Sequence, residues 1–185
     1  MQTLFIADKI DYNGSQLRSH FAFDTCQLTG NSVVAFIGGC DVKPEHMIDL
    51  ADKNAGCKIA SRKMLHFIIE DFGITLNEAI LHQRLFVATM ADLIRDLCKG
   101  AIIKRSGNDL YDGDKKINIS IATASPISCL VHVGINIDSK GTPVPTKGLA
   151  DYSVDPKGFA LELMKRYKDE VESIRIARAK VRAAK

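Results

Sequence analysis

The segment from residue 101 to residue 137 constrains the fold most strongly, because turn-forming residues divide it into three short apolar stretches. Residues 101–104, 116–122 and 129–137 predict strands, since each stretch is rich in branched apolar residues. The turns between them are Asp112-Gly113-Asp114 and Ser125-Pro126. Strands so close in sequence pair antiparallel. We therefore expect a β-meander at the core of the chain.

Alternation in the last two of these strands sorts their side chains into two faces. The apolar members of the first strand are Ile117, Ile119 and Ile121, and residues 129–137 carry a similar apolar row. The polar or small members that we expect on the opposite face are Lys116, Asn118, Ser120, His132, Gly134 and Asn136. If both apolar rows pack on the core, the glycine leaves room for a ligand among these polar groups. A solvated sheet face would give the same pattern.

Further elements are expected before and after this meander. Residues 4–7, 32–37 and 63–70 predict strands, and Gly38-Gly39 should end the second of them. Pro44 suits the first turn of a helix that ends near Gly56. Residues 76–98 have the clearest helical periodicity, and residues 16–24 are ambiguous.

The carboxyl-terminal part predicts a loop followed by a helix. Residues 139–156 contain two glycines and three prolines, which indicates a loop that forms either a lid or a surface wrap. Residues 157–185 predict an amphipathic helix that starts after Asp155-Pro156. The carboxyl-terminal end of this helix is positively charged, because residues 175–185 contain five basic side chains and no acidic one.

Length and composition indicate one domain over residues 1–185. The expected strands and helices make its class α+β, with a mixed, largely antiparallel sheet packed against helices. A chain of 185 residues that is 46% hydrophobic can fill such a core without disulfides or metal. No apolar run approaches the roughly 18 residues that span a bilayer, so we expect a cytoplasmic protein without a membrane partner. The five scattered cysteines fit neither a disulfide framework nor a zinc site, and no metal-binding residues are expected.

The sequence resembles one family of enzymes in two places. The run LFVATMADLIRDLCKGAIIKRSGNDLYDGDKK, residues 85–116, is similar to the helix, strand and NDLY-turn-KK run of biotin protein ligases. The stretch VHVGINI, residues 131–137, resembles the glycine-x-asparagine strand of the same family. The whole chain also resembles an uncharacterised prokaryotic family of similar length.

The resemblance implies a biotin/lipoate protein ligase-like catalytic domain with a class II synthetase-like fold. Such a domain binds a small carboxylic acid or its adenylate and passes the acyl group to an acceptor protein. Carried over by position, Lys116 becomes the catalytic lysine that stabilises charge on the activated carboxyl group. The substrate-binding residues that follow from the resemblance and from the polar strand face are Asn108, Asp109, His132, Gly134 and Asn136.

The resemblance also implies ATP with Mg²⁺ as cofactor, held by a loop rich in arginine and glycine. In this chain residues 52–62 read DKNAGCKIASR, and only Ala55-Gly56, Lys58 and Arg62 echo that loop. The chain departs from the family elsewhere too, since Ser106-Gly107 replaces Trp-Pro and Ile119 replaces a glycine that admits the substrate ring. Two functions therefore stay open. One is a ligase-like or acyl-transfer enzyme, and the other is a non-catalytic small-ligand or nucleic-acid binding protein.

Three other residues are candidates for reactive groups, one as a nucleophile and two as general bases. Cys40 follows two glycines and is either an exposed nucleophilic thiol or a structural cysteine. His66 and His82 are either general bases or structural histidines. The basic carboxyl-terminal helix either contacts nucleic acid through phosphates or is a solvated helix end.

Overall fold

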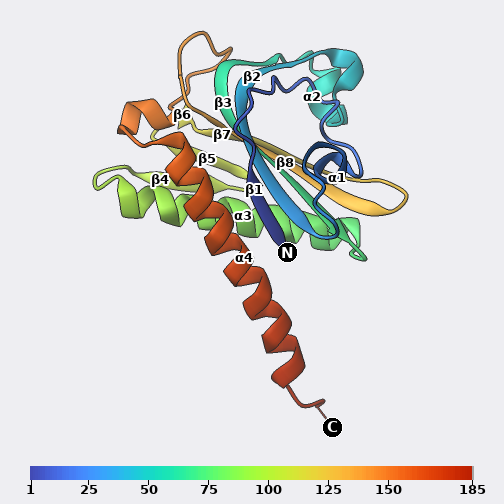
Figure 1. The fold of residues 1–185 in the computed structure, drawn as a ribbon. Coiled ribbons are helices and arrows are strands. Elements are labelled where there is room, and N and C mark those ends of the chain that lie inside the picture. Colours follow the sequence, from blue (N-terminus) through green and yellow to red (C-terminus); the bar gives the residue numbers. More distant parts are fainter. Residues whose placement is uncertain (185) are drawn as a thin grey trace.

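The computed structural model describes residues 1–184 and has a five-stranded sheet at its centre (Figure 1). The strands, in their order across the sheet, are β1 (Gln2–Phe5), β2 (Ser32–Val42), β3 (Ile59–Phe72), β8 (Ser128–Asn136) and β7 (Asn118–Ala124). β1 and β2 run parallel, and the other neighbours are antiparallel. The predicted mixed, largely antiparallel sheet is therefore confirmed.

Residues 101–137 do not form a single meander, which corrects the expectation from the sequence. β4 (Ile103–Ser106), β5 (Asp109–Asp112) and β6 (Lys115–Lys116) form a separate three-stranded sheet, and only β7 and β8 enter the central one. Buried Asn118 joins the two sheets. Its side chain accepts a hydrogen bond from the Leu110 N–H at 2.7 Å and donates one to the Asn108 carbonyl at 3.0 Å. These side-chain bonds satisfy backbone groups of the small sheet, although no continuous ladder of backbone hydrogen bonds joins the two sheets.

Two long helices cover one face of the central sheet (Figure 1). α3 (Leu76–Leu97) matches the predicted helix over residues 76–98, and it begins with a capping box in which Thr75 and Glu78 bond each other's backbone. α4 (Pro156–Lys180) begins where Asp155-Pro156 predicted a helix. The main core lies between these helices and the sheet, and it includes Phe67, Phe86 and Tyr167.

Shorter elements cover part of the other face. They are the segment before β2, which contains α1 (Phe21–Cys26), and the segment after it, which contains η1 (Pro44–His46) and α2 (Leu50–Asn54). A second core forms here around Phe36, Met64 and Ile68. β2 does not end at Ile37 as predicted but continues through the glycines, because Gly38 admits the Ile10 backbone. A Cβ at Gly38 would lie only 1.9 Å from the Ile10 carbonyl oxygen.

The two apolar rows of β7 and β8 lie on opposite faces, so the expectation that they pack together is wrong. Ile119 pairs with Gly134 and Ile121 pairs with His132. Paired residues of antiparallel strands point to the same face. Ser120 instead faces α3, where Gln83 Nε2 donates to its hydroxyl at 2.6 Å. Alternation fixes the faces within one strand, but the register between strands is set by the rest of the fold.

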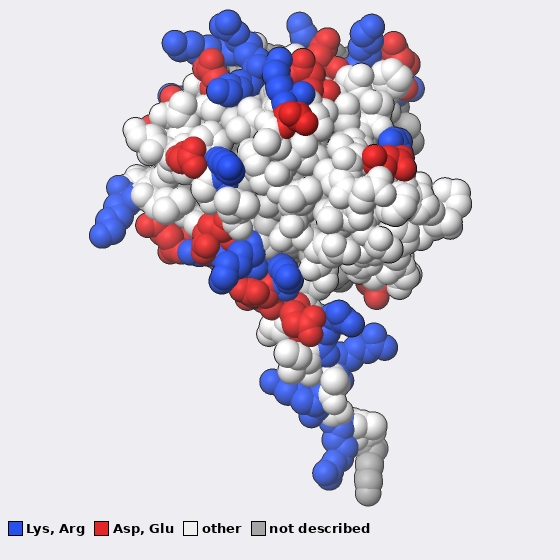
Figure 2. Space-filling view, viewed as in Figure 1, with Lys and Arg blue, Asp and Glu red and all other residues white. Residues whose placement is uncertain are grey.

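The carboxyl-terminal end of α4 projects away from the body of the molecule (Figure 1). Its buried residues lie between Phe159 and Tyr167, and every described residue after Val171 is exposed. Figure 2 shows lysine and arginine side chains along the projecting end. The predicted helix extended to Lys185, which lies outside the described residues. Within residues 1–184, no helix is both long and apolar enough to cross a membrane.

Candidate functional site

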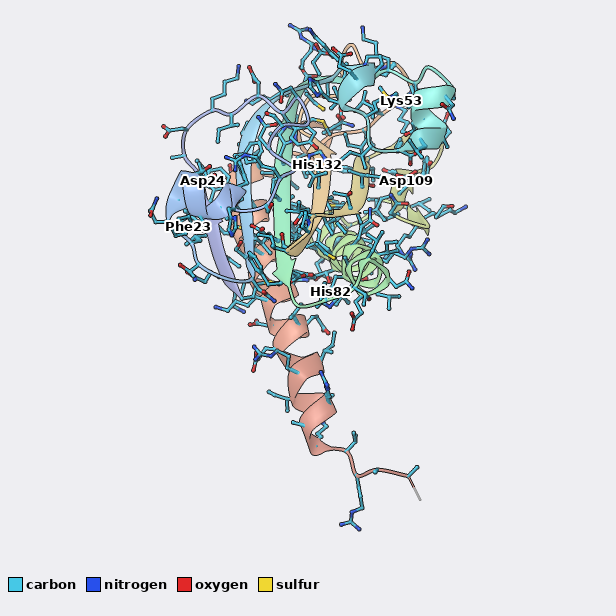
Figure 3. All side chains as sticks on the ribbon, turned by 90° about the vertical axis from the view of Figure 1, so that its right-hand side faces the viewer. Phe23, Asp24, Lys53, His82, Asp109 and His132 are labelled. Carbon is cyan, nitrogen blue, oxygen red and sulfur yellow. The ribbon has the colours of Figure 1, made fainter. Side chains whose placement is uncertain are left out.

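A cavity of about 560 Å³ opens on the face of the sheet that α3 and α4 leave free. Its walls come from the ends of β2 and β3, from residues 46–60, from residues 108–121 and from residues 142–146. In Figure 3, Lys53 on α2 and Asp109 on β5 lie to the right of His132, which is on β8. The volume is typical of small-molecule sites.

An ion pair between Lys116 and Asp109 forms one wall of the cavity. Lys116 Nζ lies 2.8 Å from Asp109 Oδ2, and both side chains are about a quarter exposed. The lysine is fixed at its backbone, because its N–H donates to the Pro145 carbonyl at 2.9 Å and its own carbonyl accepts from Lys147 N–H at 3.0 Å. The ammonium group is therefore held in place between β5 and the loop over residues 139–148.

Two asparagines lie at the same cavity. Asn108 Nδ2 donates to the Ser120 carbonyl at 2.8 Å, which ties the residue to the edge of β7. Asn136 is almost fully buried, and its Oδ1 accepts from the Ser61 hydroxyl at 2.9 Å. Among the predicted site residues, those that line this one cavity are Lys58, Asn108, Asp109, Lys116 and Asn136.

Gly134 does not provide the open space that the sequence suggested. A Cβ at this position would lie 2.8 Å from Met64 Cε and 3.2 Å from Ile119 Cγ1, so these two side chains already fill the room. The expectation failed because the residue that fills the space, Met64, belongs to β3 and is distant in sequence. Gly134 is needed here for packing between strands.

His132 also lies outside the cavity, beneath its wall. Its ring stacks on Tyr12 with centroids 3.7 Å apart, and its Nε2 lies 3.1 Å from His66 Nδ1. Burial lowers the pKa of His66 to about 4 and holds the pKa of His132 well below its usual range. Both rings are therefore neutral at pH 7, and they form a structural pair.

The segment expected to hold ATP, residues 52–62, forms part of the cavity wall, but most of its predicted nucleotide-binding residues do not face the cavity. Gly56 lies in the exposed turn after α2 with a positive φ of 65°, and Arg62 packs beside Gly141. Of the three predicted nucleotide-binding residues, only Lys58 lines the cavity. Asp49 accepts hydrogen bonds from Ala51 N–H and Asp52 N–H, so a carboxylate already caps α2.

The charge balance of the cavity also argues against a triphosphate. Two lysines, Lys58 and Lys116, line it, together with four carboxylates at Asp49, Asp52, Asp109 and Asp114. Within the part of the chain that the structure describes, no group of three His, Cys, Asp or Glu side chains has the arrangement of a metal site. Negative side chains therefore outnumber positive ones along the cavity, which disfavours a triphosphate whose charge is not neutralised by a cation.

The surroundings of two other candidates from the sequence, Cys40 and His82, fit structural roles. Cys40 lines the cavity but is buried, and burial raises the pKa of its thiol to about 12, so it lacks the thiolate form that a nucleophile needs. His82 lies on α3, away from the cavity. Its Nδ1 is 2.9 Å from Asp71 Oδ2, and this hydrogen bond raises the pKa of the histidine.

Two cavity walls were not predicted as parts of a site. They are residues 46–49 and residues 142–146. The second of these was expected only to be a lid or a surface wrap, and it meets β6 through a bridge between Lys116 and Thr146. The glycines and prolines of the loop indicated an irregular path but not its destination.

Comparison with known proteins gives the family of the chain. The model of a domain of unknown function (DUF366) matches residues 1–182. An uncharacterised protein of Methanocaldococcus jannaschii is 34% identical over 181 residues, which are 94% of this chain and 81% of that protein. The solved structure of a protein of unknown function from Pyrococcus horikoshi is 35% identical, with a TM-score of 0.93 and full coverage of both chains.

More distant solved structures share the fold. Biotin protein ligase from Aquifex aeolicus in complex with biotin and ATP has a TM-score of 0.62 at 13% identity, covering 92% of this chain and 70% of that one. A T. acidophilum protein with bound lipoic acid, provisionally assigned as a lipoate protein ligase, has a TM-score of 0.57 at 12% identity, covering 91% and 87%. Such low identities show the fold alone, and they confirm the predicted architecture. The chain belongs to the DUF366 family, and its α+β fold is that of the biotin and lipoate protein ligases.

Proposed function

We propose that this protein binds a small carboxylic acid in the cavity, with the carboxylate beside Lys116. One observation carries the proposal, namely that Lys116 on β6, Asn136 on β8 and Asn108 in the turn before β5 line the same cavity. The aliphatic part of the acid lies against the apolar side chains of the cavity, which are Val42, Met47, Ile48, Ile59 and Val144. A few convergent polar groups within an apolar pocket are typical of small-ligand sites.

The ion pair with Asp109 prepares Lys116 for this role. An ammonium group has three N–H donors, and the short contact with Asp109 Oδ2 uses one of them. The remaining donors form charge-assisted hydrogen bonds to the carboxylate of the ligand. Asp109 thus keeps the lysine oriented, and the partial burial of the pair limits screening by solvent.

Binding without nucleotide activation is supported better than a complete ligase reaction. Gly56 and Arg62 lie outside the cavity, and carboxylates outnumber lysines along its walls. We therefore assign no step to ATP or Mg²⁺ and no transfer to an acyl-acceptor protein. The alternative is that the protein forms an acyl-adenylate, as implied by the resemblance to biotin and lipoate protein ligases. This alternative predicts pyrophosphate release when ATP and an acid are supplied together.

The test is thermal stabilisation by butyrate, hexanoate, octanoate, lipoate, biotin and ATP, followed by an assay for pyrophosphate. An acid at about 100 times its Kd should stabilise the protein by about 2.7 kcal/mol. Lys116→Ala should remove this stabilisation. Lys115→Ala is the matched control, because Lys115 is an exposed neighbour that does not line the cavity. If no acid stabilises the wild type, or if Lys116→Ala retains the effect in full, the proposal is wrong.

The projecting end of α4 supports a second candidate function, which is binding to nucleic acid. Its described basic residues are Arg175, Arg178, Lys180 and Arg182, and the exposed helix end presents them to solvent. Neutralisation of phosphates by such residues gives an affinity that falls steeply with salt. Retention on RNA or DNA should then decrease on deletion of residues 172–185 and on raising the salt concentration. Equal retention with and without this segment would end the idea.

A further inference from the structure

Three side chains separate the cavity from the space around Gly134. Met64, Ile119 and Tyr12 line the cavity, whereas Gly134 does not. Behind them, a Cβ at Gly134 would lie 2.8 Å from Met64 Cε, 3.2 Å from Ile119 Cγ1 and 3.4 Å from His132 Cε1. The glycine therefore lies directly behind a wall that is one side chain thick.

The two aliphatic members of this wall differ in stiffness. Ile119 is β-branched and has few χ1 choices on a strand, and its partner in the register is Gly134. Met64 is unbranched and buried, and the methyl end of its side chain is the atom nearest to the missing Cβ. The wall thus depends mainly on how far the Met64 side chain extends. His132 is stacked behind Tyr12, on the side of the wall away from the cavity. The NMR signals of its ring should therefore respond to any molecule that passes the wall.

We infer that Met64 and Ile119 determine the length of the acid that this protein accepts, because they end the cavity over Gly134. The inference rests on the proposed function and adds the substrate class, which is a short acid whose tail stops at this wall. Acids that carry a ring or a longer chain need the space that Met64 and Ile119 occupy. The two residues are specificity-determining and not catalytic, since the charged group of the acid lies at Lys116.

The test measures Kd by calorimetry for straight-chain acids of increasing length with wild type and Met64→Ala. The substitution removes three heavy atoms, so the longest well-bound acid should gain about three carbons in the variant. Affinity for the longer acids should rise roughly fourfold for each extra methylene that the opened space buries. Met90→Ala is the matched control, because Met90 is equally buried on α3 but belongs to the core on the other face of the sheet. It should leave the length preference unchanged.

A second, smaller variant keeps the inference testable if Met64→Ala fails to fold. Ile119→Val removes one methyl group from the same wall, and it should extend the preferred acid by about one carbon. An unchanged length preference in the folded wall variants would overturn the inference while leaving the proposed function intact.

A measurement without any acid separates the geometry of the wall from the proposed function. Benzene should shift the NMR signals of the Gly134 amide and the His132 ring in Met64→Ala but not in wild type, because small apolar molecules enter apolar cavities of this kind. The same shifts in wild type would show that no wall exists and would overturn the inference. If benzene behaves as expected but neither protein binds any acid, the proposed function fails and the assigned substrate class fails with it.

Discussion

Lowering the pH should destabilise this fold through the buried pair His66 and His132. Their rings are 0% and 2% exposed, and a single hydrogen bond of 3.1 Å joins Nδ1 of one to Nε2 of the other. One nitrogen must donate and the other must accept, so protonating both rings would place two N–H groups against each other. Burial lowers the pKa of His66 from its usual 6.5 to about 4, outweighing the Gly39 and Gly38 carbonyls and Asp11, which act in the opposite direction.

The size of the effect follows from the shift for His66. A folded-state pKa below the unfolded one gives stability that is present above about pH 6.5 and is lost as the pH falls towards 4. For His66 alone the loss relative to pH 7.5 is about 2 kcal/mol at pH 5 and about 3 kcal/mol at pH 4. His132 adds to it, because burial and then the neighbouring His66 lower its pKa as well.

The assay is urea unfolding of wild type and His66→Phe between pH 7.5 and pH 5. Phenylalanine keeps an aromatic ring beside Phe36 and Tyr12 but cannot take up a proton. The variant should therefore lose about 2 kcal/mol less than wild type over this range. His82 acts with the opposite sign, because its raised pKa gives stability that is lost as the pH rises, but it is present in both proteins. Parallel pH profiles for the two proteins would refute the reasoning.

Three further predictions use the same unfolding assay or NMR. Asp155→Ala removes the carboxylate that accepts a hydrogen bond from Gly158 N–H at 2.7 Å at the start of α4. The substitution should lower the free energy of unfolding by about 1 kcal/mol. A loss near zero would mean that this helix cap is unimportant. Asp71→Asn should lower the pKa of His82 in an NMR titration, since the hydrogen bond to Asp71 is the main cause of its elevation; an unchanged pKa would contradict this cause. Deletion of residues 172–185 should change the free energy of unfolding by less than about 0.5 kcal/mol, because the described residues after Val171 are exposed. A larger loss would reveal a contact that the structure does not contain.

Local signals in the sequence predicted the elements that depend on local interactions. The helical periodicity of residues 76–98 gave α3 within one residue, and Asp155-Pro156 gave the start of α4. Alternation also identified β7 and β8. The pairing register was not predictable in the same way, because it depends on the buried amide of Asn118 and on contacts with β3. For this reason Ile119 was expected to share a face with the apolar row of residues 131–137, whereas it pairs with Gly134 on the opposite face.

The same division applies to the candidate site. The NDLY-turn-KK run placed Asn108, Asp109 and Lys116 close together, since a tight turn brings its own ends into contact. The role expected for Gly134 failed, because the sequence does not show which side chain from another strand fills the space over a glycine. Residues 142–146 were missed for a similar reason, since a loop joins a site only through the path of the folded chain.

The most direct test of the account is an ¹⁵N NMR titration of the wild-type protein with straight-chain acids from butyrate to octanoate. Binding beside Lys116 predicts saturable shift changes that concentrate on residues 108–116 and on Asn136, because these groups line one cavity. The amides of the projecting end of α4 should stay unchanged. An absence of saturable shifts, or shifts centred on another part of the surface, would contradict the central claim that this cavity binds a small carboxylic acid.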